Sequence, residues 1–214
     1  MLAYSSINHN SEVPDNFVYV TDVIKGIRFD LRYYSDDNFV GQPIPGYGSN
    51  VLILTLQAAM ALKKVQQELA YGNFALKVFD AYRPQRAVDF FTRWADDDED
   101  ERMKQIYYPN EEKSELIPKG FIAAQSAHSR GSTLDLTIYS MEDGLDLDMG
   151  TPFDFFDQKS WPSNTMVTTQ QRANRQLLRT IMGKYGFGGV EEEWWHFTLL
   201  DEPYPDTYFD FPVK

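Results

Sequence analysis

The segment at residues 126–138, Ser-Ala-His-Ser-Arg-Gly-Ser-Thr-Leu-Asp-Leu-Thr-Ile, constrains the fold of this chain most strongly. Its second half, residues 133–138, alternates polar and apolar side chains, which predicts a strand with Asp135 on the polar face. Gly131 allows a tight turn before this strand, so that His128 can approach Asp135 from the preceding loop. A histidine and an aspartate that converge in this way indicate part of a zinc site, which needs a third protein ligand.

The third ligand is predicted to be His196, because the sequence contains three histidines and His9 lies in a polar segment typical of a frayed terminus. Glu193 and His196 are three positions apart, so they face the same side of a strand only if a turn or bulge intervenes. We predict that turn, with His196 on the metal and Glu193 beside the reacting water. The alternative is a solvated acidic turn followed by an aromatic core strand. Glu191 and Glu192 are interpreted as surface charges.

Composition limits the remaining possibilities. A chain of 214 residues, 43% hydrophobic and without a linker or repeat, is expected to form one domain over residues 1–214, with residues 1–16 peripheral or poorly ordered. The net charge of -12 argues against nucleic acid and anionic membranes as partners. Without cysteine, zinc ligands must be His and carboxylate. No signal peptide or membrane span is recognised, so a cytoplasmic location is predicted, with a periplasmic one after signal removal left open.

Hydrophobic periodicity predicts three helices and several strands. The helices are expected at residues 55–70, 84–94 and 168–184, the last of them opened by a capping box. Further strands are expected at residues 17–20 and 27–33, joined by a turn at residues 25–26, and at residues 76–82. A hairpin turn at residues 188–189 leads into the His196 segment. The predicted fold class is α+β, a central antiparallel sheet flanked by helices with the zinc site at the sheet.

Six blocks, in order along the chain, resemble the D-alanyl-D-alanine dipeptidases of the VanX type. They are Phe-Asp-Leu-Arg-Tyr-Tyr at 29–34, Asn-Phe-Val-Gly at 38–41, Asp-Ala-Tyr-Arg-Pro at 80–84, Ser-x-His-x6-Asp at 126–135, Met-Gly-Thr-Pro-Phe-Asp at 149–154 and Glu-x-x-His at 193–196. The resemblance runs from about residue 18 to residue 199. It implies hydrolysis of the D-alanyl-D-alanine dipeptide to free D-alanine, in bacterial cell-wall dipeptide metabolism or glycopeptide resistance.

The resemblance also implies roles for individual residues. One Zn²⁺ per chain would be held by His128, Asp135 and His196, and Glu193 would act as general base and then as general acid. Arg83 would stabilise the tetrahedral oxyanion, whereas the alternative for Arg83 is a structural pairing with Asp80 or with a helix C-terminus. Ser126 and Tyr33 would line the substrate pocket. Asp154 would anchor the substrate ammonium or orient a metal ligand.

Two other functions stay open at this point. A related zinc D,D- or L,D-carboxypeptidase or endopeptidase would act on longer peptidoglycan peptides and would need a more open pocket. A non-catalytic, zinc-stabilised binding module would have no need of Glu193 or Arg83, and both are present. The predicted partner is therefore a small dipeptide substrate, and the resemblance adds a possible homo-oligomer.

Overall fold

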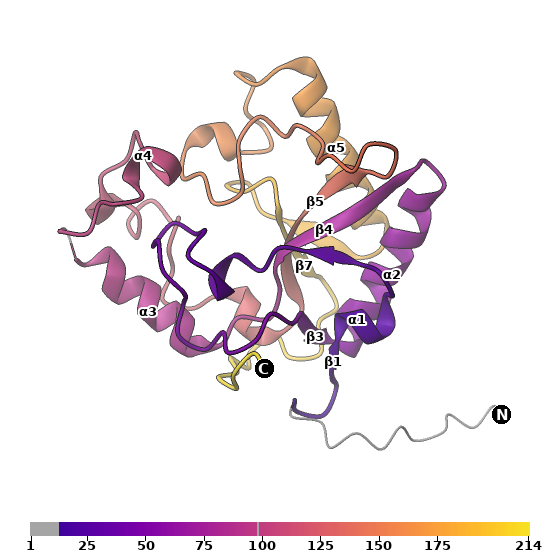
Figure 1. Cartoon of the computed structure of the whole chain (residues 1–214), viewed down its shortest axis with the longest axis horizontal. Coiled ribbons are helices and arrows are strands. Elements are labelled where there is room, and N and C mark those ends of the chain that lie inside the picture. The colour runs from indigo at the N-terminus through magenta and orange to yellow at the C-terminus, as the bar shows by residue number, and fades with distance from the viewer. Residues whose placement is uncertain (1–12, 98) are drawn as a thin grey trace.

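A five-stranded sheet forms the centre of the chain in the computed structural model, which describes residues 13–97 and 99–214 (Figure 1). Along the sheet the strands follow the order β2 (Arg28–Phe29), β4 (Phe74–Asp80), β5 (Thr133–Ser140), β7 (His196–Leu199) and β6 (Phe187–Gly189). The β2–β4 pair is parallel, and the other three pairs are antiparallel. The predicted α+β fold with a central antiparallel sheet is confirmed, with one short parallel strand added at an edge.

Strand β5 lies in the middle of this sheet and is buried on both faces. Leu134, Leu136 and Ile138 point to one face, where α2 (Leu56–Ala70) packs on β4. The opposite face carries Thr133, Asp135 and Thr137. The loop at residues 146–153 covers part of that second face, since Phe153 stacks on Phe79 of β4 with ring centroids 4.8 Å apart. The predicted alternation therefore separates the apolar core from the polar face that carries the site.

The three predicted helices are present, and two of them, α3 and α5, begin with the signal expected from the sequence. The side chain of Thr55 caps α2 by accepting a hydrogen bond from the Ala58 amide. Helix α3 (Gln85–Ala95) begins directly after Pro84. Helix α5 (Thr169–Lys184) has both halves of the capping box between Thr168 and Gln171, with distances of 3.2 and 2.8 Å. The hairpin of β6 and β7 is present, but the predicted turn position is wrong, because Gly188 and Gly189 belong to β6 and the connection to β7 spans residues 190–195.

The strands predicted at residues 17–20 and 27–33 are present only in part, and they do not pair with each other. Strand β1 (Phe17–Tyr19) pairs with β3 (Ile53–Thr55) in a second sheet, and α1 (Val20–Val23) follows it. In the second predicted strand, Arg28–Phe29 alone joins the sheet, and Arg32–Tyr34 form a 3₁₀ helix, η1. Because each strand finds its partner far away in the chain, the turn at residues 25–26 does not form a hairpin.

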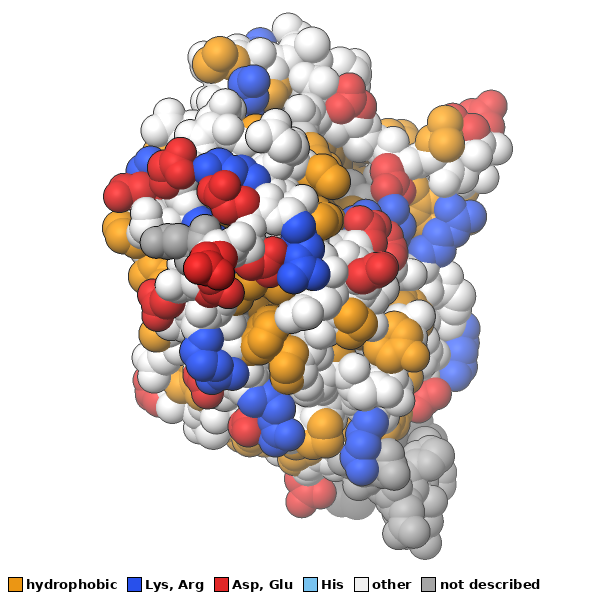
Figure 2. Space-filling model, turned by 60° about the vertical axis from the view of Figure 1, so that its left-hand side comes forward, with side chains coloured by type: hydrophobic (Ala, Val, Ile, Leu, Met, Phe, Trp, Pro, Cys, Tyr) orange, Lys and Arg blue, Asp and Glu red, His pale blue; other side chains and the backbone are white. Residues whose placement is uncertain are grey.

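The described part of the N-terminal segment is packed against the domain. Residues 1–12 of the segment predicted to be peripheral, and His9 with them, lie outside the described residues. Val13 is buried, and the carbonyl oxygen of Asn16 accepts a hydrogen bond of 2.7 Å from the Leu56 amide. Over the described residues, no helix has the length and apolar character that a membrane span requires. On the face drawn in Figure 2, Lys and Arg alternate with Asp and Glu rather than forming a basic patch.

Gly131 connects the site loop to β5 in a backbone conformation that favours glycine. Its φ is 85°, in the left-handed region, and it ends the 3₁₀ helix η3 (Ala127–Arg130). A Cβ at this position would lie 2.2 Å from Cε1 of Phe17. The Gly131 carbonyl also accepts a hydrogen bond of 2.8 Å from the Thr55 amide. The turn predicted from the sequence therefore depends both on the left-handed backbone and on the absence of a side chain.

Gly131→Ala is expected to lower the free energy of unfolding by about 1–3 kcal/mol for the backbone conformation, with a further cost from the contact with Phe17. Denaturant unfolding monitored by circular dichroism would measure the change. Gly183→Ala is the matched control, because Gly183 lies in α5 and a Cβ there would meet no atom within 4 Å. That variant should be neutral or gain up to about 1 kcal/mol. Equal stability of the two variants would contradict the role of Gly131.

Candidate metal centre and active site

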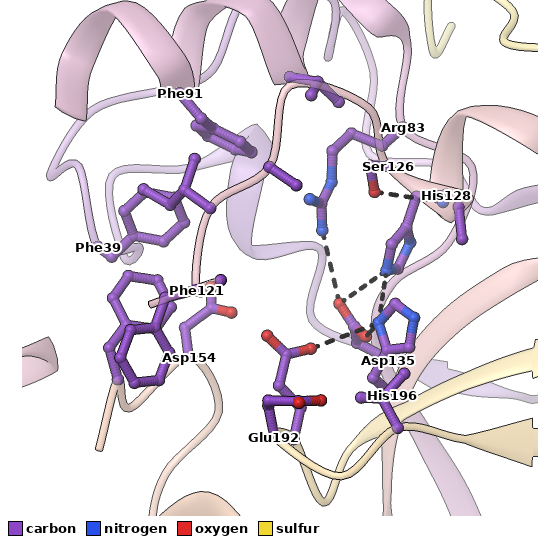
Figure 3. A pocket seen from close by; sticks show the side chains of 18 of the residues that line it. Phe39, Arg83, Phe91, Phe121, Ser126, His128, Asp135, Asp154, Glu192 and His196 are labelled. Atoms are coloured by element: carbon purple, nitrogen blue, oxygen red, sulfur yellow. Dashed lines mark hydrogen bonds and ion pairs between the residues drawn. The ribbon is translucent and has the colours of Figure 1, made fainter. Parts of the chain in front are cut away.

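Three predicted ligands meet on the polar face of the sheet, as Figure 3 shows. Asp135 of β5 lies directly opposite His196 of β7 in the strand register, and His128 approaches from η3. His128 Nε2 lies 3.2 Å from Asp135 Oδ2, and His196 Nδ1 lies 3.1 Å from Asp135 Oδ1. The two imidazole nitrogens are 3.3 Å apart. The three side chains thus present one ligand atom each toward a common point.

The protonation of this cluster suits a metal ion. Nδ1 of His128 lies 2.7 Å from the carbonyl oxygen of Ala81, which can only accept, so Nδ1 carries the proton and the Nε2 lone pair faces the cluster. Asp135 is 2% exposed, and its Oδ1 has no well-aligned hydrogen bond. Burial alone would raise the pKa of Asp135, but the two adjacent imidazoles hold it below its usual range. Two imidazole nitrogens and a carboxylate oxygen form a donor set that Zn²⁺ accepts.

Glu193 lies beside this cluster, in the turn before β7 that the sequence predicted. Its Oε2 is 3.4 Å from His196 Nδ1, and its side chain is 20% exposed. Trp194 and Trp195, which follow it, are both buried. Removal from solvent, reinforced by the charge of Asp135 and opposed by His196, raises the pKa of Glu193 to about 7. This carboxyl group is therefore suited to proton transfer near neutral pH.

Arg83 follows β4 and reaches the cluster from the opposite side. Its Nη2 is 3.6 Å from Asp135 Oδ2, while its Nε donates to Asp80 Oδ2 at 2.9 Å. The guanidinium also lies over the rings of Tyr33 and Phe91, at 4.9 and 5.4 Å from their centroids. The pairing with Asp80 that we considered as an alternative is present. The same guanidinium still faces the three predicted ligands, which we call the metal cluster.

These side chains line a cavity of about 210 Å³. The other three predicted site residues, Ser126, Tyr33 and Asp154, line it as well. The Tyr33 hydroxyl donates to Asp154 Oδ2 at 2.8 Å, and Ser126 Oγ accepts from the His128 amide at 3.3 Å. Burial, with a contribution from the charge of Asp135, raises the pKa of Asp154 well above its usual range. A positively charged group in the cavity would therefore stabilise the Asp154 carboxylate.

Sequence reasoning missed several residues around the cavity. Glu192, which was interpreted as a surface charge, lines the cavity (Figure 3). Glu191 does lie on the surface, where it pairs with Arg179 at 2.6 Å. An apolar wall faces the metal cluster and is formed by Phe39, Phe91 and Phe121 (Figure 3). The segment before β7 is a turn rather than a strand, so Glu192 and Glu193, although adjacent, both line the cavity.

Comparison with known proteins places this chain in a peptidase family. A family model described as D-ala-D-ala dipeptidase, Peptidase_M15, matches residues 14–214. A D-alanyl-D-alanine dipeptidase of Enterococcus faecalis is 45% identical over 94% of this chain and 99% of its own length. Proteins of the same name from Enterococcus faecium and Streptomyces coelicolor are 42% and 43% identical, each over 92% of this chain and 98% of their own length. The chain belongs to the D-Ala-D-Ala dipeptidase family of peptidases.

Proposed function

We propose that this protein hydrolyses the D-alanyl-D-alanine dipeptide to free D-alanine, with one zinc ion per chain held by His128, Asp135 and His196. The observation that carries the proposal is the convergence of these three side chains with Glu193 and Arg83 in one small cavity. The names of three relatives at 42–45% identity support the substrate. When bound, the metal would supply a Lewis acid that polarises the scissile carbonyl and lowers the pKa of water.

The cavity supports a small substrate with a free amino terminus. Its volume of about 210 Å³ is below the roughly 300–1,000 Å³ of pockets that bind drug-sized molecules. The Asp154 carboxylate, oriented by the Tyr33 hydroxyl, would bind the substrate ammonium. Ser126 lies at the same cavity and would contact the peptide. The phenylalanine wall offers an apolar surface to the alanine methyl groups.

Glu193 and Arg83 would carry out different parts of the reaction. Glu193 would accept the proton of the attacking water and then deliver it to the leaving amine, a role that its place beside His196 in the cavity allows. Arg83 would donate N–H groups to the oxygen of the attacked carbonyl as negative charge develops there. Both side chains line the cavity, and both lie close to a metal ligand.

Hydrolysis of longer peptides is the alternative, and nothing in the described cavity favours it. A carboxypeptidase or endopeptidase must accept several residues on the amino side of the scissile bond, whereas the cavity volume suits a dipeptide. The cytoplasmic location, the homo-oligomer, and the role in cell-wall dipeptide metabolism or glycopeptide resistance stay predictions from the sequence and the resemblance.

The purified protein is expected to release D-alanine from D-alanyl-D-alanine, to lose that activity with a chelator, and to recover it with zinc. A coupled assay for D-alanine measures release, with L-alanyl-L-alanine and a longer peptide ending in D-alanyl-D-alanine as comparison substrates. His128→Ala should lose both bound zinc and activity, and His9→Ala, which removes the histidine not assigned to the site, is the matched control. Full turnover by metal-free protein, or faster cleavage of the longer peptide, would contradict the proposal.

Glu193→Gln is expected to keep zinc while turnover falls by about 10²–10⁴-fold, because positioned proton transfer contributes that much. Asp135→Asn should instead weaken zinc binding, because it removes a charged ligand. Elemental analysis and kcat would be measured for both variants. Glu191→Gln is the matched control, since Glu191 lies on the surface two residues from Glu193. Loss of zinc from Glu193→Gln would make Glu193 a ligand rather than the base.

Arg83→Ala is expected to retain zinc and to lose about 10²–10³-fold in kcat, the cost of removing one donor to an oxyanion. The Michaelis constant should change less, because the interaction forms mainly in the transition state. Steady-state kinetics on D-alanyl-D-alanine, together with zinc content, would measure both effects. A rise in the Michaelis constant at unchanged kcat would place Arg83 in substrate binding instead.

A further inference from the structure

Asp80 is a fully buried carboxylate that the proposed chemistry does not use. It is 0% exposed, lies at the end of β4 where the pairing with β5 is shifted by a bulge, and stands opposite Asp135. Its Oδ1 accepts the Tyr47 hydroxyl at 2.7 Å, and its Oδ2 accepts Arg83 Nε at 2.9 Å. Neither Asp80 nor Tyr47 is among the residues that line the cavity. Asp80 and Tyr47 can therefore influence the reaction only through Arg83 or through a predicted metal ligand.

The Arg83 guanidinium makes contacts on two sides. On the side away from the cavity, Nε donates to Asp80, and on the side facing the cavity, Nη2 lies 3.6 Å from Asp135 Oδ2. The guanidinium is planar, so fixing Nε sets the direction of both terminal nitrogens. The Arg83 side chain is 13% exposed. Without the hydrogen bond to Asp80, the guanidinium could turn toward the carboxylates of Glu193 and Asp154, which line the same cavity.

A distant segment holds Tyr47 in place behind Asp80. Val213, next to the last residue of the chain, donates its amide to the Gly46 carbonyl at 2.8 Å and accepts from the Gly48 amide at 2.8 Å. Gly46 has a φ of 101°, and a Cβ there would lie 2.6 Å from Cγ of Pro84. The loop thus approaches closely beside the residue that follows Arg83. This packing brings the Tyr47 hydroxyl to Asp80 from 33 residues away.

We infer that Asp80, held by Tyr47, is a positioning residue that aims the guanidinium of Arg83 at the reacting carbonyl. The inference rests on the proposed role of Arg83. A route through His128 is less direct, because His128 Nδ1 is 3.6 Å from Asp80 Oδ2 and already donates to the Ala81 carbonyl at 2.7 Å. Asp80 thereby gives Arg83 a fixed partner outside the cavity and leaves the terminal nitrogens of Arg83 directed toward the substrate.

A double-mutant cycle tests this inference on the zinc-loaded protein. Asp80→Asn is expected to lower kcat by about 10- to 100-fold, since a misplacement of about 1 Å can cost that much, with zinc content and the Michaelis constant nearly unchanged. In the Arg83→Ala background, the same Asp80→Asn change should lower kcat little further, because the group it positions is already absent. Asp30→Asn is the matched control. Asp30 accepts a hydrogen bond of 2.9 Å from Nε of Arg32, and neither residue lines the cavity.

Tyr47→Phe provides a second test if Asp80→Asn fails to fold. It removes the hydroxyl behind Asp80 and keeps the ring, so kcat should fall by a few fold in wild-type protein and stay unchanged in the Arg83→Ala background. Tyr185→Phe is its control, because the Tyr185 hydroxyl bonds to Glu68 outside the cavity.

The outcomes separate this inference from the proposed function. If the effects of Asp80→Asn and Arg83→Ala multiply, Asp80 acts independently of Arg83 and the inference is wrong, while the proposed function stands. If Asp80→Asn releases zinc, Asp80 acts through the metal ligands and the inference is again wrong. If Arg83→Ala leaves kcat unchanged, the proposed role of Arg83 fails, and the inference fails with it.

Discussion

The pairing of β5 with β7 is the constraint on which the site depends, because it places Asp135 directly opposite His196. Residues opposite each other on adjacent strands point to the same face, with Cβ atoms about 4.5–5.5 Å apart. A slip of one residue would turn one of these two predicted ligands to the face covered by α2 and separate the cluster. The hydroxyls of Thr133 and Thr198, 2.9 Å apart, mark the next pair on the same face. The register that buries the apolar side chains therefore also builds the metal cluster.

His128, a predicted ligand, is placed by hydrogen bonds to the backbone rather than by strand register. His128 Nδ1 donates to the Ala81 carbonyl at 2.7 Å, and the Arg83 amide donates to the His128 carbonyl at 3.3 Å. The segment that leaves β4 and the turn that enters β5 thus hold each other in place. The same segment carries Arg83, so the His128 imidazole and the Arg83 guanidinium are positioned by one junction. A change of backbone conformation there would move a predicted ligand and the predicted oxyanion donor together.

The sequence predicted the features that neighbouring residues encode. It did not predict the features that depend on contacts between distant segments. The capping box at Thr168, the turn at Gly131 and the alternation within β5 are encoded by neighbouring residues, and all three are present. The parallel pairing of β2 with β4 and the pairing of β1 with β3 depend on distant partners, which no local pattern specifies. Tyr47 lies in a segment rich in Gly and Pro that the sequence marks only as irregular. Its contact with Asp80 exists because the C-terminal residues pack against that loop.

The carboxyl groups that line the cavity outnumber its cationic side chains. Asp135, Asp154 and Glu193 all line it, whereas Arg83 is the one Lys or Arg among its described lining residues and is already paired with Asp80. Burial disfavours the ionised form of a carboxyl group, and the charge of Asp135 adds to this effect, which is why the pKa of Glu193 rises to about 7 and that of Asp154 rises well above its usual range. In the proposed reaction, a divalent cation would offset the charge at Asp135, and a substrate ammonium would offset the charge at Asp154. A peptide with a blocked amino terminus could not form this ion pair with Asp154, whereas a free dipeptide could.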